Sequence, residues 1–454
     1  MEQNIFDHIF HSSLPTIDRE AIREEWRSIK PPYDINARRL PLPIWARRGL
    51  TDSGEKAWAT LHDELRQPNE TKAYCIYIHV PFCANKCAFC DCYSFRLRRH
   101  RSRQIDLYLA ALDQEMRLWS QMGSLAQRPV STVHLGGGTP TFLGEGAFRR
   151  LVQSCRHHFN ISPQTEWALE TTSSELDDPI FSMLDSLGFT RIHLGVQSLD
   201  DPIRGLIGRR ESSKAVLAKL TKAISLGWVT SVDLICGLPS QSLESILKDI
   251  DMLSNIGVHG FSLYELQRSH GNRQFIEQNG LMDRERLSDY FFFQGASQRL
   301  VSLGYRKRFF NHFALKEDKD LYFTFPERGE DCLAMGTIAD GVFNSYHYRH
   351  PVYGAYCKSV SQTFPGLMGG VRNNAREDSL ASLETAILSG EISVAHLVQV
   401  FGRERSHELL QQWFESALVV TDPEDAGTLL LTTNGSWFAG EMMANLFEKL
   451  PRLN

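Results

Sequence analysis

The sequence predicts an α/β fold built on a parallel sheet. Six short apolar or alternating segments recur between residues 75 and 266, five segments of helical period separate them, and most connections are short. Parallel strands require crossovers of this kind, and right-handed crossovers bring successive strands into one sheet. The sheet is therefore either open and doubly wound or curved into a partly closed barrel.

Each predicted element follows the last in a regular alternation. Strands are expected at 75–80, 131–137, 165–172, 191–198, 230–239 and 261–266, and helices at 106–122, 147–159, 179–189, 212–228 and 242–258. Polar residues lie near the ends of three strands, at Glu170, Gln197 and Asp233. That edge carries the chemistry of parallel α/β proteins, although helix caps and turns explain such residues equally well when each is taken alone.

The alternation ends near residue 280. Residues 283–305 have the pattern of an amphipathic helix, and residues 306–315 that of a strand that extends the sheet. From about residue 379 the pattern predicts a small helical or winged domain, with a hairpin before the last helix. The first 70 residues are rich in proline and arginine, so we expect an extended arm. The expected divisions of the chain are 1–70, 71–282, 283–378 and 379–454.

Composition excludes several classes of protein. The 454 residues are 23% charged and 42% hydrophobic, as in ordinary globular proteins, and the net charge of −5 gives no reason to expect a nucleic-acid partner. There is no apolar run of about 20 residues, and the first residues lack the basic-then-apolar order of a signal peptide. We therefore expect a cytoplasmic protein without a membrane span, and a monomer.

Four of the nine cysteines, Cys83, Cys87, Cys90 and Cys92, lie within ten positions. In a reducing compartment, this crowding indicates cofactor ligation and not a disulfide framework. A structural zinc site usually takes two separated pairs, and a bacterial ferredoxin has C-x2-C-x2-C spacing, so neither fits well. The C-x3-C-x2-C spacing supplies three thiolates and leaves one iron of a cubane cluster open. Cys92 is only two positions after Cys90, so we interpret it as a nearby residue with its own role.

Two glycine-rich segments follow predicted strands. HLGGGTPT (134–141) lacks both the lysine of a P-loop and full GxGxxG spacing, and ICGLP (235–239) is a similar strand exit. Consecutive glycines allow the backbone to approach a ligand closely. A tight turn explains either segment equally well.

The cysteine loop, with an aromatic residue before its third cysteine and a glycine motif at the next strand, resembles the cluster loop of radical S-adenosylmethionine (radical SAM) enzymes. The order of YIHVPFC, CxxxCxFCxC, GGGTPT, GVQS, LIGRR, DLICGLP, NHFA and LAMG resembles the oxygen-independent coproporphyrinogen III oxidase-like (HemN-like) family over about residues 70–345. A weaker match occurs at LTTNGSWF. The resemblance implies a partial parallel (β/α)6 barrel with a sheet extension and a small C-terminal domain.

The same resemblance implies the cofactors. Cys83, Cys87 and Cys90 would hold a [4Fe–4S] cluster whose open iron binds S-adenosylmethionine (SAM). An electron, delivered by a donor such as flavodoxin or ferredoxin, would cleave SAM to methionine and a 5′-deoxyadenosyl radical. Two SAM molecules are expected. The contacts carried over by motif are Tyr77, Gly137 and Glu170 for the first molecule, and Phe89, Gly138, Thr139, Gln197, Arg209 and Asp233 for the second. Gln267 and Asp340 depart from the family pattern at two further contact positions.

The resemblance leaves three reactions open. Oxidative decarboxylation of tetrapyrrole propionates is expected first, with Cys92 in a catalytic role, because the oxidases retain this cysteine and the related heme chaperones generally lack it. A class C radical SAM methyltransferase, including the type that degrades heme anaerobically, is the alternative, because the N-terminal arm is unlike that of the oxidases. A heme-binding chaperone without turnover is the third possibility. His347 and His350 are candidate heme ligands or surface residues.

Overall fold

Six parallel strands form the centre of a 13-stranded mixed sheet in the computed structural model, which describes residues 2–11, 17–66, 71–98, 102–282 and 286–449. The strands are β2 (Tyr74–Val80), β5 (Val130–Gly137), β6 (Glu166–Thr171), β7 (Arg191–Gln197), β8 (Val229–Cys236) and β9 (Gly260–Glu265). The connecting helices are α5 (Ser102–Ser120), α6 (Glu145–His158), α7 (Asp178–Ser186), α9 (Ser213–Ser225) and α10 (Leu243–Asn255). The α/β fold and this alternation are confirmed. The short helix α8 (Asp201–Leu206) is an addition to the predicted elements.

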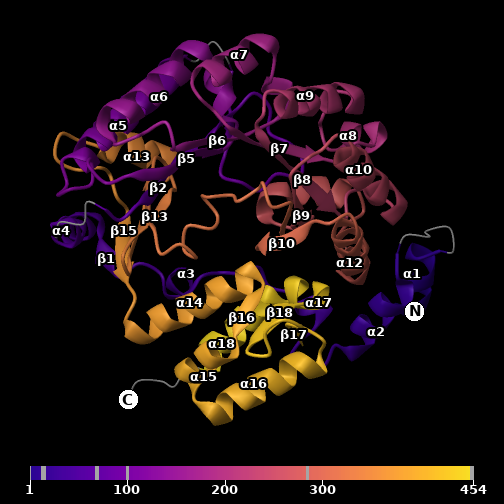
Figure 1. Ribbon diagram of the computed structural model, residues 1–454. Coiled ribbons are helices and arrows are strands. Elements are labelled where there is room, and N and C mark those ends of the chain that lie inside the picture. The colour runs from indigo at the N-terminus through magenta and orange to yellow at the C-terminus, as the bar shows by residue number, and fades with distance from the viewer. Residues whose placement is uncertain (1, 12–16, 67–70, 99–101, 283–285, 450–454) are drawn as a thin grey trace.

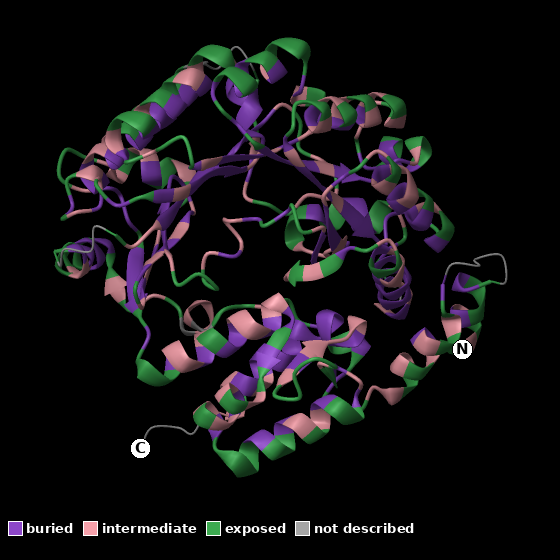
Figure 2. Cartoon of the chain, viewed as in Figure 1, coloured by how far each residue is buried: buried purple, intermediate pink, exposed green. Residues whose placement is uncertain are grey.

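The sheet curves strongly, and its helices cover the outer face (Figure 1). Alternate strand residues explain this arrangement. Those that point outward, such as Ile76, Leu169 and Val232, are almost fully buried in the main hydrophobic core, and burying each stabilises the fold by about 1.5–3 kcal/mol. Figure 2 shows the buried strands and the exposed outer sides of the helices. The inward-facing residues include histidines and carboxylates, so the inner face of the curve is polar.

Further strands extend the sheet at both edges. On one side, β12 (Asp331–Met335) pairs in parallel with β2, and β13 (Asp340–Phe343), β14 (Tyr346–Arg349), β15 (Gly369–Arg372) and β1 (Asp52–Ser53) follow as antiparallel strands. On the other side, β11 (His312–Ala314) pairs with β9, and β10 (Arg306–Phe309) pairs with β11. The predicted extension at 306–315 is thus two strands, separated by a turn in which Phe310 has a φ of 47°. The helix predicted before it is α12 (Arg286–Ser302).

Residues 316–330, between β11 and β12, form an inner segment that lies within the curve of the sheet, drawn in orange in Figure 1. Two contacts fix it there. Asp318 accepts from Arg191 of β7 at 2.5 Å, and the Tyr322 ring stacks on Tyr77 of β2 with centroids 5.0 Å apart. The inner segment therefore fills part of the space that the strands enclose.

The C-terminal domain lies across the open side of the curve (Figure 1). It contains a three-stranded sheet in the order β16 (Glu391–Ser393), β18 (Thr428–Leu431) and β17 (Val419–Thr421). Its helices are α14 (Ala375–Ser389), α15 (Val394–Phe401), α16 (Arg403–Glu415), α17 (Thr433–Trp437) and α18 (Ala439–Lys449). Helix α14 packs against β10, and α17 packs against α12. Two further short helices are α11 (Arg273–Gln278) and α13 (Tyr353–Ser359).

The expectation of an extended N-terminal arm is wrong about its secondary structure. This part of the chain contains α1 (Glu2–Ile9), α2 (Arg19–Ser28), α3 (Ile44–Arg48) and α4 (Gly54–Leu65). The aromatic residues Phe6, Phe10 and Trp26 form an apolar side that packs on Phe291 of α12, which stabilises helices that local periodicity barely indicated. The division limits themselves stay a prediction. None of the described helices is both long and apolar enough to cross a membrane.

Candidate functional site

The cysteine loop begins where β2 ends. The short strands β3 (Phe82–Cys83) and β4 (Phe95–Arg96) pair in parallel and close the base of the loop. The Lys86 ammonium donates to the carbonyls of Cys92 and Ser94 at 3.4 and 3.2 Å, which draws the ends of the loop together. Within it, Cys83 is buried, Cys87 and Cys90 are half-buried, and Cys92 is exposed. The structure therefore presents the three predicted ligands from one compact turn.

Cys92 contacts one of the predicted cluster ligands. Its thiol and its backbone amide both donate to the Cys90 sulfur, and although burial opposes ionisation, these contacts lower the pKa of Cys90 to about 6. On the other side of the loop, burial raises the pKa of Cys87, while the nearby Arg209 guanidinium favours its thiolate. Cys92 is close enough to affect Cys90, a predicted cluster ligand, and its role as a non-ligand stays a prediction.

The glycine loop after β5 packs directly against the cysteine loop. Gly138 and Thr139 donate their amides to the carbonyls of Val80 and Phe82, at 2.8 and 2.9 Å, and the Thr139 hydroxyl lies 3.5 Å from the Cys83 sulfur. Gly137 has a φ of 105°, and a Cβ there would meet the His79 ring at 2.5 Å. Since these two amides are occupied, Gly138 and Thr139 can offer a ligand their carbonyl groups.

Glu170, at the end of β6, faces the inside of the curve. His134 Nε2 lies 2.9 Å from one carboxylate oxygen, and the Gly137 amide donates to the other at 3.2 Å. Burial would raise the pKa of Glu170, but these two hydrogen bonds and the charges of His134 and His193 lower it to about 2. The side chain remains 31% exposed, so it offers an ionised carboxylate to an ammonium group or to ribose hydroxyls.

Gln197 and Arg209 come together over Gly195 of β7. A Cβ at Gly195 would lie 2.9 Å from Gln197 Nε2 and 3.4 Å from Arg209 Nη2, so glycine makes room for both side chains. Gln197 has a φ of 70°, a conformation that non-glycine residues rarely adopt and that is concentrated at functional sites. Among the described residues, Gln197 Oε1 and Arg209 Nε have no hydrogen-bond partner although both atoms are buried.

Asp233, on β8, is held by a histidine from the neighbouring strand. His193 Nε2 lies 2.5 Å from Asp233 Oδ1, and His193 Nδ1 lies 2.8 Å from the Ser231 hydroxyl. Burial disfavours a charged imidazole, but the Asp233 and Glu170 carboxylates raise the pKa of His193 to about 9. The His193 imidazolium therefore lies between Glu170 and Asp233, the two carboxylates that the family resemblance assigns to the first and the second SAM molecule.

The two predicted aromatic contacts lie in different surroundings. Phe89 packs against a small apolar cluster that contains Ile235 and Leu266, and its carbonyl accepts from Asn272 at 2.8 Å. Tyr77 lies on β2, and its hydroxyl is 3.0 Å from His79 Nδ1. The Tyr322 ring covers Tyr77, so the inner segment forms a floor beneath this part of the site.

A cavity of about 770 Å³, here called the lateral cavity, lies between the inner segment, strands β12 to β14 and helix α14. Its aromatic walls are Trp45, Phe309, Phe310 and Phe325, and its acidic lining residues are Glu327, Glu330, Asp331, Asp340, Asp378 and Glu384. Among the described lining residues, Lys72 is the only lysine or arginine, and it is paired with Asp331. The predicted cluster and SAM residues do not line this cavity.

Four further residues that the sequence analysis named, two histidines and two departures from the family pattern, are not among the predicted cluster and SAM residues. His347 lines the lateral cavity, stacks on Trp45, and has its pKa lowered to about 4 by burial. His350 is 1% exposed, and its nitrogens contact Ala339 and Glu115, so it is neither a surface residue nor available to a metal. Of the departures from the family pattern, Asp340 forms a two-contact ion pair with Arg349, and Gln267 donates to Glu265.

Sequence reasoning missed His134, His193 and Tyr322. The two histidines had a usable signal, because alternation along β5 and β7 places them on the same face as their neighbouring glycines and Gln197. Tyr322 had none, because nothing local indicates that residues 316–330 turn back into the curve. His134 contacts Glu170, His193 contacts Asp233, and the Tyr322 ring covers Tyr77.

The donor set fits the cofactors that the sequence suggests. Three cysteine sulfurs from one turn suit an iron–sulfur cluster with an open iron. Beside them lie a carboxylate with a low pKa and two buried polar atoms without partners, on Gln197 and Arg209. Orphaned buried polar groups are rare in folded proteins and are satisfied here if a polar ligand binds. An amino-acid-bearing nucleoside has the complementary groups.

Comparisons with known proteins find relatives and a solved structure that resemble this chain. Residues 77–253 match the model of the radical SAM superfamily. The chain is 30% identical over 248 residues to the oxygen-independent coproporphyrinogen III oxidase of Salmonella typhimurium, a match that covers 54% of this chain and 53% of the relative. The chain thus matches about half the length of that oxidase.

Two longer matches extend over most of the chain. Anaerobilin synthase of Escherichia coli O157:H7 is 26% identical over 431 residues, which cover 92% of this chain and 93% of the relative. The solved structure of the coproporphyrinogen III oxidase HemN from Escherichia coli superposes with a TM-score of 0.73 at 22% identity, and covers 87% of this chain and 94% of that one. At that identity the superposition shows a shared fold.

Proposed function

Since this chain belongs to the radical SAM superfamily and is a HemN-like member of it, we propose that it cleaves SAM reductively and acts on a tetrapyrrole. The observation that carries the proposal is the convergence of three cysteines, the Glu170 carboxylate and the unpartnered groups of Gln197 and Arg209 at one edge of the sheet. In parallel α/β folds, this edge carries the chemistry.

The cofactors and the protein have separate tasks. When bound, a [4Fe–4S] cluster and SAM supply one-electron chemistry at carbon. Cys83, Cys87 and Cys90 hold the cluster. Glu170 binds the ammonium group or ribose of the first SAM, with Tyr77 and Gly137 beside it, and the Tyr322 floor excludes water from below. The electron donor, a small flavin or iron–sulfur protein, stays a prediction.

A second SAM would bind on the other side of the same edge. Arg209 suits its carboxylate, because a guanidinium forms paired hydrogen bonds with that group. Asp233 and Gln197 suit its ribose and other polar groups, Phe89 supplies an apolar contact, and Gly138 and Thr139 supply carbonyls. The unpartnered atoms of Gln197 and Arg209 support this assignment.

The lateral cavity has room for a large flat ligand, but none of the predicted cluster or SAM residues line it, so it suits docking of a macrocycle and not the radical step itself. Its volume of about 770 Å³ falls within the usual range for ligand sites, and its aromatic walls suit the faces of a macrocycle. The carboxylates of the lining do not decide between tetrapyrroles, because Glu330, Asp331 and Asp340 are paired with Arg328, Lys72 and Arg349.

The match to anaerobilin synthase along almost the whole chain supports methyl transfer with opening of the heme ring over decarboxylation of propionates, because the match to the oxidase covers about half of the chain. Decarboxylation remains the second candidate, and the presence of Cys92 favours it, since the oxidases that the sequence resembles retain this cysteine. Binding of heme without turnover is the third.

One experiment separates these candidates. Anaerobically reconstituted, reduced protein is incubated with methyl-labelled SAM and either heme or coproporphyrinogen III, and the products are identified by mass spectrometry. Label in an opened tetrapyrrole supports the first candidate. Label wholly in methionine, with carbon dioxide released from coproporphyrinogen, supports the second. Bound heme with no product from either substrate contradicts both.

The lateral cavity is tested separately by titrating unreduced protein with heme and recording the absorbance. Phe309→Ala removes an aromatic wall and is expected to weaken heme binding about tenfold. The control is Val301→Ala, at an exposed position of α12 outside the cavity. Equal heme affinities for the two variants would contradict the assignment of the cavity.

A further inference from the structure

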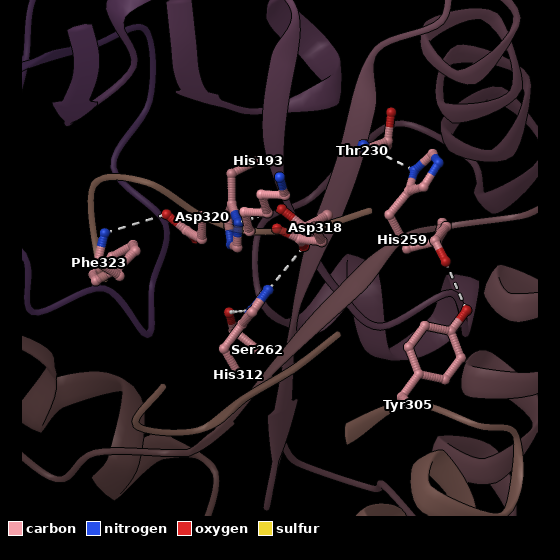
Figure 3. A network of polar contacts seen from close by, with 12 residues as sticks. His193, Thr230, His259, Ser262, Tyr305, His312, Asp318, Asp320 and Phe323 are labelled. Carbon is pink, nitrogen blue, oxygen red and sulfur yellow. Dashed lines mark hydrogen bonds and ion pairs between the residues drawn. The ribbon is translucent and has the colours of Figure 1, made fainter. Parts of the chain in front are cut away.

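His193 lies at the centre of a charged group on the inner face of the sheet. On one side it meets Asp233 of β8 at 2.5 Å, and on another it is close enough to Glu170 of β6 and Asp320 of the inner segment for their charges to act on it. Figure 3 shows His193 beside Asp318 and Asp320, with His312 next to them. The His193 and His312 rings lie 6.1 Å apart.

Apart from Asp320, which accepts from the Phe323 amide at 3.3 Å, the other charged groups around His193 are already paired. Asp318 accepts from Arg191 at 2.5 Å and lies 2.9 Å from His312 Nε2, while Arg191 also donates to Glu166 at 3.0 Å. His134 is engaged with Glu170. Tyr264 of β9 faces the same carboxylates, and their charges add to burial in raising its pKa, so it stays neutral. His193 is therefore the group on this wall that balances Asp233.

The contact leaves half of the Asp233 carboxylate open. Oδ1 is occupied by His193, and the side chain of Asp233 is 22% exposed while that of His193 is 11% exposed. A carboxylate with one oxygen fixed retains a second oxygen that accepts from hydroxyl or ammonium donors. The opposite nitrogen of His193 contacts Ser231, so the imidazole ring is held at both ends and its orientation is set by the strand.

We propose that His193 is a positioning residue for the second SAM site, where it holds Asp233 in the orientation that accepts the hydroxyl groups of that ligand. This inference rests on the proposed function, because it assumes that Asp233 contacts a second SAM. His193 touches Asp233 and not the ligand. Its contribution is to fix one rotamer of the carboxylate and to keep an imidazolium next to it.

The charge of His193 gives the proposal a pH signature. The raised pKa of about 9 means that the imidazolium is present at neutral pH and is lost as the pH rises through 9. Above that pH, Asp233 is held by a neutral ring, and no imidazolium at position 193 offsets the nearby charges of Glu170 and Asp320. Affinity at the second site is therefore expected to fall between pH 8 and 10 in the wild type.

The test measures binding without turnover. Unreduced, cluster-loaded protein is dialysed against labelled SAM, which gives the number of molecules bound and the dissociation constant of each. His193→Leu removes the hydrogen bond, and His193→Gln keeps a neutral donor. The control is His259→Gln, which replaces a histidine that accepts from the Thr230 amide outside the site. Thermal unfolding of each variant confirms that it is folded.

The wild type and His259→Gln are expected to bind two molecules. His193→Leu is expected to keep the first and to weaken the second at least tenfold. His193→Gln is expected to restore most of that loss at pH 7.5 and to remove the part of the pH dependence that the wild type shows between pH 8 and 10.

Three results overturn the inference. Equal second-site affinity in the wild type and a folded His193→Leu protein contradicts positioning by His193. An unchanged pH dependence in His193→Gln does so as well. A wild type that binds one SAM removes the second site on which the inference rests. Failure of the proposed function is distinguishable, because cluster-loaded wild type would then bind no SAM at all.

Discussion

Arg38 of the N-terminal segment and Glu265 at the end of β9 form a buried ion pair, with Nη1 2.5 Å from Oε2 and side chains 2% and 7% exposed. The guanidinium also lies 3.9 Å from the centre of the Trp437 ring of α17, and its Nε donates to the Trp437 carbonyl at 3.1 Å. One residue thus connects the N-terminal segment, the functional edge of the sheet and the C-terminal domain.

Replacing Arg38 is expected to destabilise the fold strongly. Arg38→Met leaves the Glu265 carboxylate buried without its partner, which costs about 3–5 kcal/mol in the free energy of unfolding. Arg39→Met is the control, because the pair that Arg39 forms with Glu448 is 61% and 64% exposed and is worth about 1 kcal/mol or less. Denaturant unfolding measures both. An equal loss of unfolding free energy in Arg38→Met and Arg39→Met would mean that the buried Arg38–Glu265 pair contributes no more to stability than the exposed pair does.

Cluster content tests the assignment of the cysteines. Alanine at Cys83, Cys87 or Cys90 is expected to abolish the brown absorbance and the iron content after reconstitution, because each removes a ligand. Cys92→Ala is expected to keep both. Cys357→Ala, in α13, controls for loss of a thiol elsewhere. If Cys92→Ala loses its iron while Cys357→Ala keeps it, Cys92 is a cluster ligand and the three-ligand assignment is wrong.

Glu170 is expected to contribute to SAM affinity through its charge. Glu170→Gln keeps the shape of the side chain and removes the ionised acceptor, whose hydrogen bond to a charged donor is worth about 1.5–3 kcal/mol, or about 10- to 100-fold in the dissociation constant. Equilibrium dialysis of unreduced protein measures it. Glu145→Gln, at an exposed position of α6, is expected to bind as the wild type does. An unchanged affinity in Glu170→Gln would remove this residue from the first SAM site.

The six parallel strands and the helices between them were predictable because their signals are local. Alternating apolar residues and helical periods between residues 75 and 266 each indicate one element, and crossovers then fix the order of the strands. The grouping of Glu170 and Gln197 followed from their places near strand ends, whereas Asp233 lies within β8, three residues before its last residue. The N-terminal helices and the Tyr322 floor were not predictable, since both depend on contacts with residues more than 200 positions away.

Acid is expected to destabilise the fold through the half-buried imidazole of His347. Burial lowers its pKa to about 4, whereas a histidine in the unfolded chain has a pKa near 6.5. Between these values the unfolded chain binds a proton that the folded protein does not, so the free energy of unfolding falls as the pH drops from 6.5 towards 4. His347→Gln is expected to reduce this loss.

Denaturant unfolding between pH 7 and 5 measures the effect of His347 as the difference between wild type and variant, because Asp249 and Glu441, whose pKa values burial raises to about 6 and about 7, change protonation there in both proteins. The exposed His407→Gln serves as the control. A pH dependence in His347→Gln equal to that of the wild type would mean that the imidazole gains its proton as easily in the folded protein as in the unfolded chain.

Formation of 5′-deoxyadenosine is the direct measure of reductive SAM cleavage by this protein. Reduced, reconstituted wild-type protein is incubated with SAM under anaerobic conditions, and 5′-deoxyadenosine is quantified by chromatography with Cys87→Ala as the matched control. We expect 5′-deoxyadenosine and methionine in equal amounts from the wild type, an increase when heme is added, and neither product from Cys87→Ala. Wild-type protein that holds a full cluster and binds SAM, yet forms no 5′-deoxyadenosine with or without a tetrapyrrole, would contradict reductive cleavage.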